Sequence, residues 1–277
     1  MPLLPANARA ARLRFRIKSS EKSVCQFDEL FAIFSELHSP SEIDTEIELV
    51  TDHTASDSSR TAIEIIADGL TESVLWGVGI ALPSIARSNM KRFNCGVDHV
   101  TVCVPSVNMA NTLRSLQESE GISEGSGSGL MHMSRGVAVG SVVFDACTVS
   151  IVSPIERIPH LEAFLLRYPS GAVQHFAVSV PSMREALSRV RARGIPTLQD
   201  LLRAKGRSRT LPLSMGGVLT EGFVEELCAG GHLRQTFVFP EREAIGPFIE
   251  IVERASVSGY GSENPRVLFE ALDCICE

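Results

Sequence analysis

Two histidines recur at the same place in two similar stretches of the chain. Residues 97–107 read VDHVTVCVPSV and residues 173–183 read VQHFAVSVPSM, and six of the eleven positions are identical. A single histidine in a strand is usually a core residue with satisfied hydrogen bonds, but two unrelated core histidines would not fall at equivalent positions of a repeat. The repeat therefore indicates that His99 and His175 share a function, and paired imidazoles are common metal ligands.

Strand geometry predicts the surroundings of both histidines. Because side chains alternate between the two faces of a strand, each histidine shares its face with small residues while large apolar residues occupy the opposite face. The small residues are Thr101, Cys103, Ala177 and Ser179. The large ones are Val100, Val102, Val104, Phe176, Val178 and Val180. The histidines are thus predicted to point away from the apolar layer, toward a space where a ligand or a metal fits.

Glu250 is the carboxylate that would complete such a site. It stands between Ile249 and Ile251 in GPFIEIVER, and a charge in so apolar a strand is costly unless it is paired. The spacing also fits repeated modules, because His175 follows His99 by 76 residues and Glu250 follows His175 by 75. Two histidines and one carboxylate leave about three coordination positions open, as in non-heme Fe(II) oxygenases. We therefore predict a metal site made by these three residues.

Each histidine segment begins a repeated structural unit. A strand that ends at a proline is followed by a helix and then by β-rich sequence, so each unit reads as a βαβββ module. The strands are predicted at 97–104, 173–180, 232–239 and 247–253, with one or two more within 141–152. The helices are predicted at 106–120, 160–168, 183–193 and 265–274. The fold class is therefore α+β, with tandem βαβββ modules whose open, curled sheet encloses the metal site.

The first third of the chain carries no chemical motif. Short strands are predicted at 13–17, 45–50, 61–66 and 73–82, with a helix over 27–37. The stretch LWGVGIALPSI at 75–85 echoes the histidine segments, with a glycine at the histidine position. We predict a reduced, degenerate N-terminal domain over residues 1–92 and a catalytic domain with both modules over residues 93–277.

Composition argues against several classes of partner. The 277 residues carry a net charge of −7, and the one basic cluster, at 203–209, lacks interleaved aromatic residues, so we expect no nucleic-acid binding. No apolar run approaches membrane-spanning length, so we expect no membrane partner. The seven cysteines include no CxxC pair, and the first residues lack the apolar region of a secretory signal. These features predict a reduced, cytoplasmic protein and leave an organellar transit peptide as the alternative.

Four blocks of the sequence resemble the 4-hydroxyphenylpyruvate dioxygenase and hydroxymandelate synthase-like family, within the vicinal-oxygen-chelate superfamily of glyoxalase-like folds. They read GVDHVTVCVP, GAVQHFAVSV, GHLRQTFVFPEREAIGPFIEIVER and GYGSENPRVLFEAL. The last two blocks, in this order, are specific to the family rather than to the wider superfamily. The resemblance spans residues 93–277, and the first 92 residues are only vaguely similar to the family's N-terminal domain.

This resemblance implies an Fe(II) site of His99, His175 and Glu250, with O2 as co-substrate. A 2-oxo acid would chelate the iron through its carboxylate and keto oxygens, and oxidative decarboxylation and hydroxylation would act on the same molecule, without separate 2-oxoglutarate. The residues that it implies for substrate binding are Gln174, Gln235, Phe237, Phe248, Tyr260 and Asn264. Strand alternation places Gln174 on the face opposite to His175, so either the strand is kinked there or Gln174 packs behind the ligand.

Two departures from the family pattern argue for an altered substrate. Pro265 stands where the family has a second ring-stacking aromatic residue, and Val152 stands where the family has an asparagine. One wall of an aromatic sandwich and one polar contact are therefore missing. We expect a small-molecule 2-oxo acid that is smaller, aliphatic or a differently shaped aryl compound, in specialised metabolism.

Two other functions on the same scaffold remain open at this point. An extradiol-type dioxygenase or an isomerase is one, but glyoxalase-like isomerases usually have a fourth protein ligand, and the first module offers only Asp145 in FDACTVSIVSP. A non-catalytic protein that binds small molecules is the other, but such a protein is expected to lose a ligand and all three are present. The sequence does not decide whether the chain forms a homodimer.

Overall fold

The structure of the chain is a computed structural model. It describes residues 13–19, 21–37, 46–51, 62–67, 90–94, 96–119, 130–133, 136–143, 148–206, 221–228, 230–240, 242, 244–257, 261 and 264–276. None of the described helices combines the length and the apolarity that crossing a bilayer requires.

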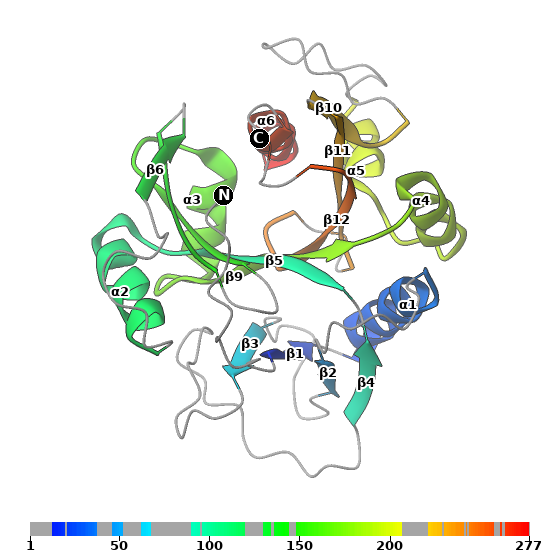
Figure 1. Ribbon diagram of the computed structural model, residues 1–277, viewed down its shortest axis with the longest axis horizontal. Coiled ribbons are helices and arrows are strands. Elements are labelled where there is room, and N and C mark those ends of the chain that lie inside the picture. Colours follow the sequence, from blue (N-terminus) through cyan, green and yellow to red (C-terminus); the bar gives the residue numbers. More distant parts are fainter. Residues whose placement is uncertain are drawn as a thin grey trace.

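Eight strands form one mixed sheet that curls around the C-terminal helix (Figure 1). Their spatial order is β10-β11-β12-β9-β5-β8-β7-β6. The strands are β5 (Val97–Cys103), β6 (Leu130–Met133), β7 (Val137–Val143), β8 (Thr148–Pro154), β9 (Ala172–Ser179), β10 (Val224–Cys228), β11 (Gly231–Val238) and β12 (Phe248–Ala255). The helices of this part are η2 (Ser106–Asn108), α2 (Met109–Ser119), α3 (Pro159–Arg167), α4 (Met183–Ala192), α5 (Leu198–Ala204) and α6 (Asn264–Cys276).

The sheet consists of two modules with the same topology. In each module the first strand pairs in parallel with the last, β5 with β8 and β9 with β12, and the two middle strands are added antiparallel at the outside. The modules join through β5 and β9, which lie antiparallel at the centre of the sheet. The predicted tandem βαβββ fold is therefore confirmed, and the two histidine-bearing strands are immediate neighbours.

The outer face of the large sheet is the apolar one. All six large residues predicted to lie opposite the histidine face are buried there, together with residues from α1 (Glu21–Leu37) and α4. The Phe31 ring of α1 stacks on Phe176 of β9, with 5.5 Å between ring centroids. Burial of a large aliphatic or aromatic side chain stabilises a fold by about 1.5–3 kcal/mol, so this layer fixes which way each strand faces.

The inner face of the sheet is covered by α3, α5 and α6. Helix α3 packs on the first module, where it shares an apolar cluster with residues of β5, β7 and β8. Helices α5 and α6 pack on the second module, in a cluster that includes Phe237 of β11 and Phe248 of β12. The helices α3 and α6, here called the inner helices, thus lie inside the curl of the large sheet, opposite its apolar outer layer (Figure 1).

A glycine permits the tight connection from α3 into β9. Gly171 has a φ of +89°, which favours glycine, and a Cβ added there would lie 2.7 Å from the carbonyl oxygen of Cys103. The close approach of these backbones sets where β9 begins beside β5.

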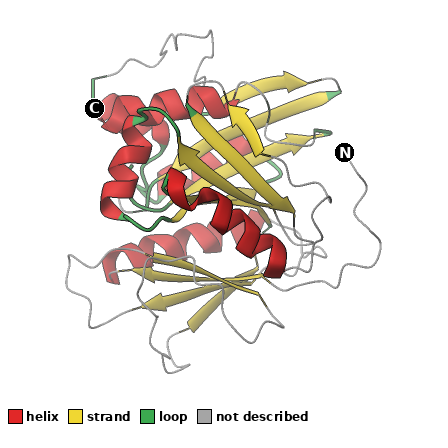
Figure 2. Ribbon diagram, turned by 90° about the vertical axis from the view of Figure 1, so that its left-hand side faces the viewer, coloured by secondary structure: helices red, strands yellow, loops and turns green. Residues whose placement is uncertain are grey.

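The N-terminal part forms a separate sheet. Its strands are β1 (Leu13–Ser19), β2 (Glu46–Thr51), β3 (Ala62–Ala67) and β4 (Met90–Asn94), in the order β3-β1-β2-β4. The two sheets form separate layers with helices between them (Figure 2). This strand order differs from that of the two modules, and β4 extends past the predicted boundary at residue 92. The proposed division into a reduced N-terminal domain and a catalytic domain remains a prediction.

The sequence analysis missed four elements of the described chain. They are β4, β6, β10 and α5, all between four and seven residues long. Such short segments contain too few residues to show a clear hydrophobic period. The strand predicted at 73–82 and the degenerate echo at 75–85 lie outside the described residues.

A buried carboxylate ties the second module together. Glu253 of β12 accepts hydrogen bonds from the backbone N–H of Met183 at the start of α4, from Nε2 of His232 at 2.7 Å and from Arg234 at 2.8 Å. Burial alone would raise the pKa of Glu253, but these donors lower it below the usual value of 4.5. Because the folded state binds the proton less well than the unfolded chain, the carboxylate adds stability above that pH and loses it on acidification.

We expect Glu253→Gln to reduce the free energy of unfolding at pH 7 by about 2 kcal/mol, since it removes charge-assisted hydrogen bonds. The difference from the wild type should shrink as the pH falls below 4.5, when the native carboxylate takes up its proton. Urea unfolding at several pH values measures both. Glu185→Gln, on the exposed side of α4, is the matched control and should change little. An equal loss at pH 7 and at pH 3 would contradict this account.

Candidate metal centre

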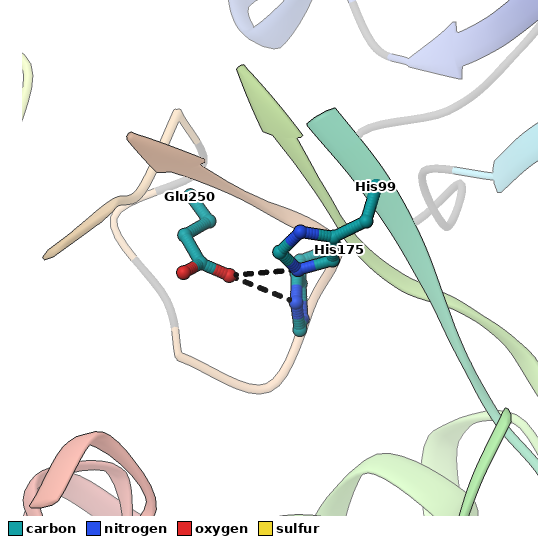
Figure 3. Close-up of side chains that lie close together, drawn as sticks. All are labelled: His99, His175 and Glu250. Atoms are coloured by element: carbon teal, nitrogen blue, oxygen red, sulfur yellow. Dashed lines mark ion pairs between the residues drawn. The ribbon is translucent and has the colours of Figure 1, made fainter. Parts of the chain in front are cut away.

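Three predicted ligands meet on the inner face of the sheet (Figure 3). Nε2 of His99 lies 3.1 Å from Oε2 of Glu250, and Nε2 of His175 lies 3.2 Å from the same oxygen. All three side chains are buried, with 3–4% of their surface exposed. One donor atom from each side chain lies within 4.8 Å of the donor atoms of the other two. Among the described residues, this is the group of His and Glu side chains that is close enough together to hold a metal ion.

The strand register explains why the three residues converge. Glu250 of β12 and His99 of β5 are both paired with Ala177, which lies between them on β9. The methyl group of Ala177 leaves space above it, so the two longer side chains reach each other across the strand. His175 is two residues before Ala177 on the same face, as strand alternation predicts. The three predicted ligands therefore lie on one face of the sheet.

Each histidine follows a β-bulge. The pairing of β5 with β9 shifts by one residue between Val97 and His99, where Asp98 is the extra residue of β5. It shifts back between Thr101 and Val102, where Gln174 is the extra residue of β9. A bulge turns the side chain of the extra residue out of strict alternation. The residue before each ligand can therefore reach the ring of that ligand.

These two residues bind the outer nitrogens of the histidines. Oδ1 of Asp98 lies 2.8 Å from Nδ1 of His99, and Oε1 of Gln174 lies 3.2 Å from Nδ1 of His175. A carboxylate and an amide carbonyl can only accept, so Nδ1 of each ring carries the proton, and in the neutral ring Nε2 presents a lone pair to the site. Metal-binding histidines are oriented by this kind of contact. The two alternatives left open by the sequence therefore occur together, because the strand is irregular at Gln174 and the side chain packs behind a predicted ligand.

Arg254 holds Asp98 in place. Its guanidinium makes two hydrogen bonds to the Asp98 carboxylate, at 2.6 and 2.8 Å, and this bidentate contact fixes the plane of the acceptor. Burial by itself would raise the pKa of Asp98, but Arg254 and His99 hold it well below its usual range. The sequence analysis did not single out either residue. The sequence did contain a signal for Asp98, because a polar residue directly precedes the histidine in both segments, an aspartate in VDHV and a glutamine in VQHF.

The electrostatics of the cluster favour a bound cation. Burial alone would lower the pKa of His99, but the charge of Glu250 and the bond to Asp98 raise it to about 9. Burial also acts to raise the pKa of Glu250, but His99 and His175 lower it to about 2. Desolvation lowers the pKa of His175. Without a metal, a proton on His99 therefore offsets the negative charge of Glu250. A divalent ion bound between these side chains would offset the same charge.

The donor set fits a divalent transition metal. Two neutral imidazoles that are fixed through Nδ1, with one carboxylate oxygen, form the set typical of non-heme iron. Gln235 of β11 donates through Nε2 to the other oxygen of Glu250, at 2.6 Å. This hydrogen bond leaves Oε2 of the glutamate facing the two histidines. The predicted metal ligands are thus brought together by this structure.

Aromatic rings surround His175. Phe248 stacks on its imidazole with 5.1 Å between centroids, and Phe237 lies at 5.8 Å. The two phenylalanines also contact each other at 4.7 Å. Both rings are buried, so the second module supplies an apolar wall beside the metal position.

Of the remaining residues predicted to bind substrate, Gln235 contacts a predicted ligand and Asn264 contacts the strand that carries Gln235. Gln235 contacts Glu250 directly, and its Oε1 is buried without a hydrogen-bond partner. Asn264, at the start of α6, donates to the carbonyl of Leu233, two residues before Gln235 on β11. Tyr260 lies outside the described residues. Val152, where the resemblance expects an asparagine, is buried in the apolar cluster under α3.

The first module has a serine where the second has Glu250. Ser150 of β8 is paired with Thr101, as Glu250 of β12 is paired with Ala177, and the two positions are equivalent in the repeat. Its hydroxyl contacts that of Ser141 at 3.2 Å. A fourth acidic ligand is therefore absent at this equivalent position, and Asp145 lies outside the described residues.

Comparison with known proteins supports the resemblance. No family model matches the chain. It is 26% identical over 131 residues to a 4-hydroxyphenylpyruvate dioxygenase of Neurospora crassa, in a match that covers 44% of this chain and 32% of that protein. It is 26% identical over 121 residues to the enzyme of the same name from Xenopus tropicalis, covering 41% and 31%. The match thus spans about a third of the length of these relatives. The resemblance stated from the four sequence blocks is confirmed.

A solved structure shares the fold. The chain superposes on a xylose isomerase-like TIM barrel/4-hydroxyphenylpyruvate dioxygenase fusion protein with a TM-score of 0.56 and 13% sequence identity. The superposition covers 97% of this chain and 53% of that protein. The similarity therefore concerns the fold of nearly the whole chain.

We expect added Fe(II) or Co(II) under anaerobic conditions to stabilise the wild type. At a hundredfold excess over the dissociation constant the gain is about 2.7 kcal/mol, because the ion binds only the folded chain. His175→Ala and Glu250→Gln should abolish the gain, since each removes one of three donors. Thermal unfolding with and without the metal measures it. His232→Ala changes a histidine outside the cluster and should retain the full gain. Full stabilisation of His175→Ala would refute the ligand assignment.

The contacts behind the histidines should control metal affinity. We expect Asp98→Asn and Gln174→Leu each to weaken binding about 10- to 100-fold, because the imidazoles lose the acceptor that orients them. Anaerobic titration calorimetry with Co(II) gives the dissociation constants. Glu221→Gln, which removes an exposed ion pair with Arg184, is the control and should leave affinity unchanged. Unchanged affinity in Asp98→Asn would mean that His99 needs no such orientation.

Proposed function

We propose that the chain is an Fe(II)-dependent dioxygenase that acts on a small-molecule 2-oxo acid. The observation that carries the proposal is the buried set of three donors, two histidines and one glutamate, with both imidazoles oriented through Nδ1. The partial similarity to 4-hydroxyphenylpyruvate dioxygenases supports the same reaction class. Iron held in this way would supply a site at which the 2-oxo acid chelates and O2 reacts.

The protein would contribute to this reaction by setting the charge at the metal and by holding the ligands in place. Fe(II) with one carboxylate ligand carries about one positive charge, which suits an anionic substrate with two oxygen donors. Asp98 and Gln174 keep the imidazoles aimed at one point, and Gln235 keeps Glu250 from rotating. These fixed groups need no rearrangement during the reaction, and such preorganisation is a major source of catalysis.

The walls around the ligands set the class of substrate. Phe237 and Phe248 offer apolar contact beside His175, and Gln235 presents its unpartnered Oε1 to accept a hydrogen bond. On the side of the first module, Val152 and the residues of its cluster offer apolar contact in place of an amide. Together with Pro265 at the start of α6, these residues favour a substrate that differs from 4-hydroxyphenylpyruvate, in specialised metabolism.

A glyoxalase-like isomerase is the second candidate on this scaffold, and Ser150 argues against it. Such an enzyme usually has a fourth protein ligand, for which the position equivalent to Glu250 is the natural place. A serine hydroxyl there is a weak ligand for a divalent ion and leaves that position to substrate or O2. A non-catalytic binding protein would have no use for three intact, oriented donors.

Anaerobic loading with Fe(II), followed by a panel of aryl and aliphatic 2-oxo acids and then O2, tests the proposal. We expect at least one acid to give equal O2 uptake and CO2 release, with oxygen incorporated into the remainder of the same molecule and no need for 2-oxoglutarate. Glu250→Ala should give neither. Absence of O2 uptake with every acid, in protein shown to bind the metal, would contradict the proposal.

A further inference from the structure

A third histidine is buried on the inner side of the sheet, and no step above uses it. His160, the second residue of α3, is 2% exposed. Its Nδ1 lies 2.6 Å from Oδ1 of Asp273 on α6, and the same oxygen accepts the backbone N–H of His160 at 3.1 Å. The ring also packs edge-on against Phe269 of α6, with 5.0 Å between centroids. The side chain therefore joins the two inner helices.

The other ring nitrogen of His160 has no partner. Nε2 is buried and makes no hydrogen bond. A buried polar atom without a partner costs about 1–3 kcal/mol, so native proteins rarely retain one unless a ligand or water satisfies it. Because the Asp273 carboxylate can only accept, Nδ1 carries the proton, and Nε2 of the neutral ring is an acceptor. Nε2 of His160 can therefore be satisfied only by a group that donates a hydrogen bond.

The inner helices bring this acceptor toward the metal ligands. Helix α6 packs through Leu268 and Leu272 into the cluster that holds Phe237 and Phe248, the two rings that contact His175. The next residue after each of these leucines, Phe269 and Asp273, contacts His160.

Two further buried atoms on this side share the same character. Oε1 of Gln235 and Oδ1 of Asn264 have no hydrogen-bond partner. In each amide the nitrogen donates, to Glu250 and to the Leu233 carbonyl respectively, so the oxygen is the acceptor that is left over. The unpartnered buried atoms of these three residues are thus all acceptors. A ligand that satisfies them must bring donors.

We propose that His160, oriented by Asp273, is a substrate-contacting residue whose Nε2 accepts a hydrogen bond from a hydroxyl or N–H group at the end of the substrate away from its 2-oxo acid. The inference rests on the proposed function, which fixes the other end of the substrate at the metal. It narrows the substrate class to 2-oxo acids that carry such a donor. Asp273 is a positioning residue, because it acts only through the ring that it orients.

Pairs of 2-oxo acids that differ only by a terminal hydroxyl test this inference. The probes are phenylpyruvate with 4-hydroxyphenylpyruvate, and an aliphatic pair of equal chain length with and without an ω-hydroxyl. Calorimetry on the Fe(II)-loaded, anaerobic protein gives their affinities. We expect the wild type to bind the hydroxylated member of at least one pair about tenfold more tightly, since its loss leaves Nε2 unpaired.

Substitutions separate recognition from a structural role. His160→Leu should remove the preference for the hydroxylated acid and leave the affinity for the plain acid within about twofold, because one hydrogen bond is lost. His160→Gln, which keeps an acceptor, should retain part of the preference. Val190→Leu, in the outer layer at α4, is a control for general repacking. An equal loss for both members of a pair, alongside a lower unfolding temperature, would show that His160 only ties α3 to α6.

A measurement without substrate distinguishes failure of this inference from failure of the proposed function. In Zn(II)-loaded protein with ¹⁵N-labelled histidine at pH 8, the signals that disappear in His160→Gln report its ring. We expect a proton on Nδ1 and none on Nε2. A proton on Nε2, or equal affinities within every pair in the wild type, would overturn the inference. If no 2-oxo acid binds at all, the proposed function fails, and a proton absent from Nε2 would still support the acceptor role.

Discussion

The burial of Glu250 is the constraint on which the rest of the site depends. An isolated carboxylate in the interior of a protein costs several kcal/mol, and the attraction of its partners offsets this cost only if their geometry is good. Here one oxygen faces two imidazoles and the other accepts from Gln235. Charges of alternating sign continue outward from Glu250 through His99 and Asp98 to Arg254, which lies on the same strand as Glu250. The network therefore begins and ends on β12, and its two middle residues lie on β5.

The two β-bulges make this network compatible with a regular sheet. Strict alternation would turn Asp98 and Gln174 toward the outer apolar layer, where an ionised carboxylate and an amide have no partners. One extra residue on β5 and one on β9 cancel in the register, so the sheet continues on both sides while both acceptors reach the histidines. The repeat of this device in the two modules explains why the residue before each histidine is polar.

The sequence predicted the parts of the fold and site that depend on periodicity and repetition. The shared face of His99, His175 and Glu250 follows from strand alternation and from the 76- and 75-residue spacing, and the apolar outer layer follows from the same pattern. Alternation failed at Gln174, because a bulge leaves no mark on the hydrophobic pattern. Arg254 and Asp273 were also missed, since each contributes through a partner more than a hundred residues away in the chain. Such pairs are defined only once the topology is known.

The two modules have diverged at equivalent positions of their last two strands. At equivalent positions the second module has Phe237 and Glu250 where the first has Ser141 and Ser150. The second module therefore supplies the charge and the aromatic wall, while the first supplies two small hydroxyl side chains. A symmetric pair of glutamates would surround an ion with four protein donors and two negative charges, which favours a neutral or weakly bound substrate. The asymmetric pair retains one negative charge, so a divalent ion held there would keep its attraction for the anionic chelator of the proposed function.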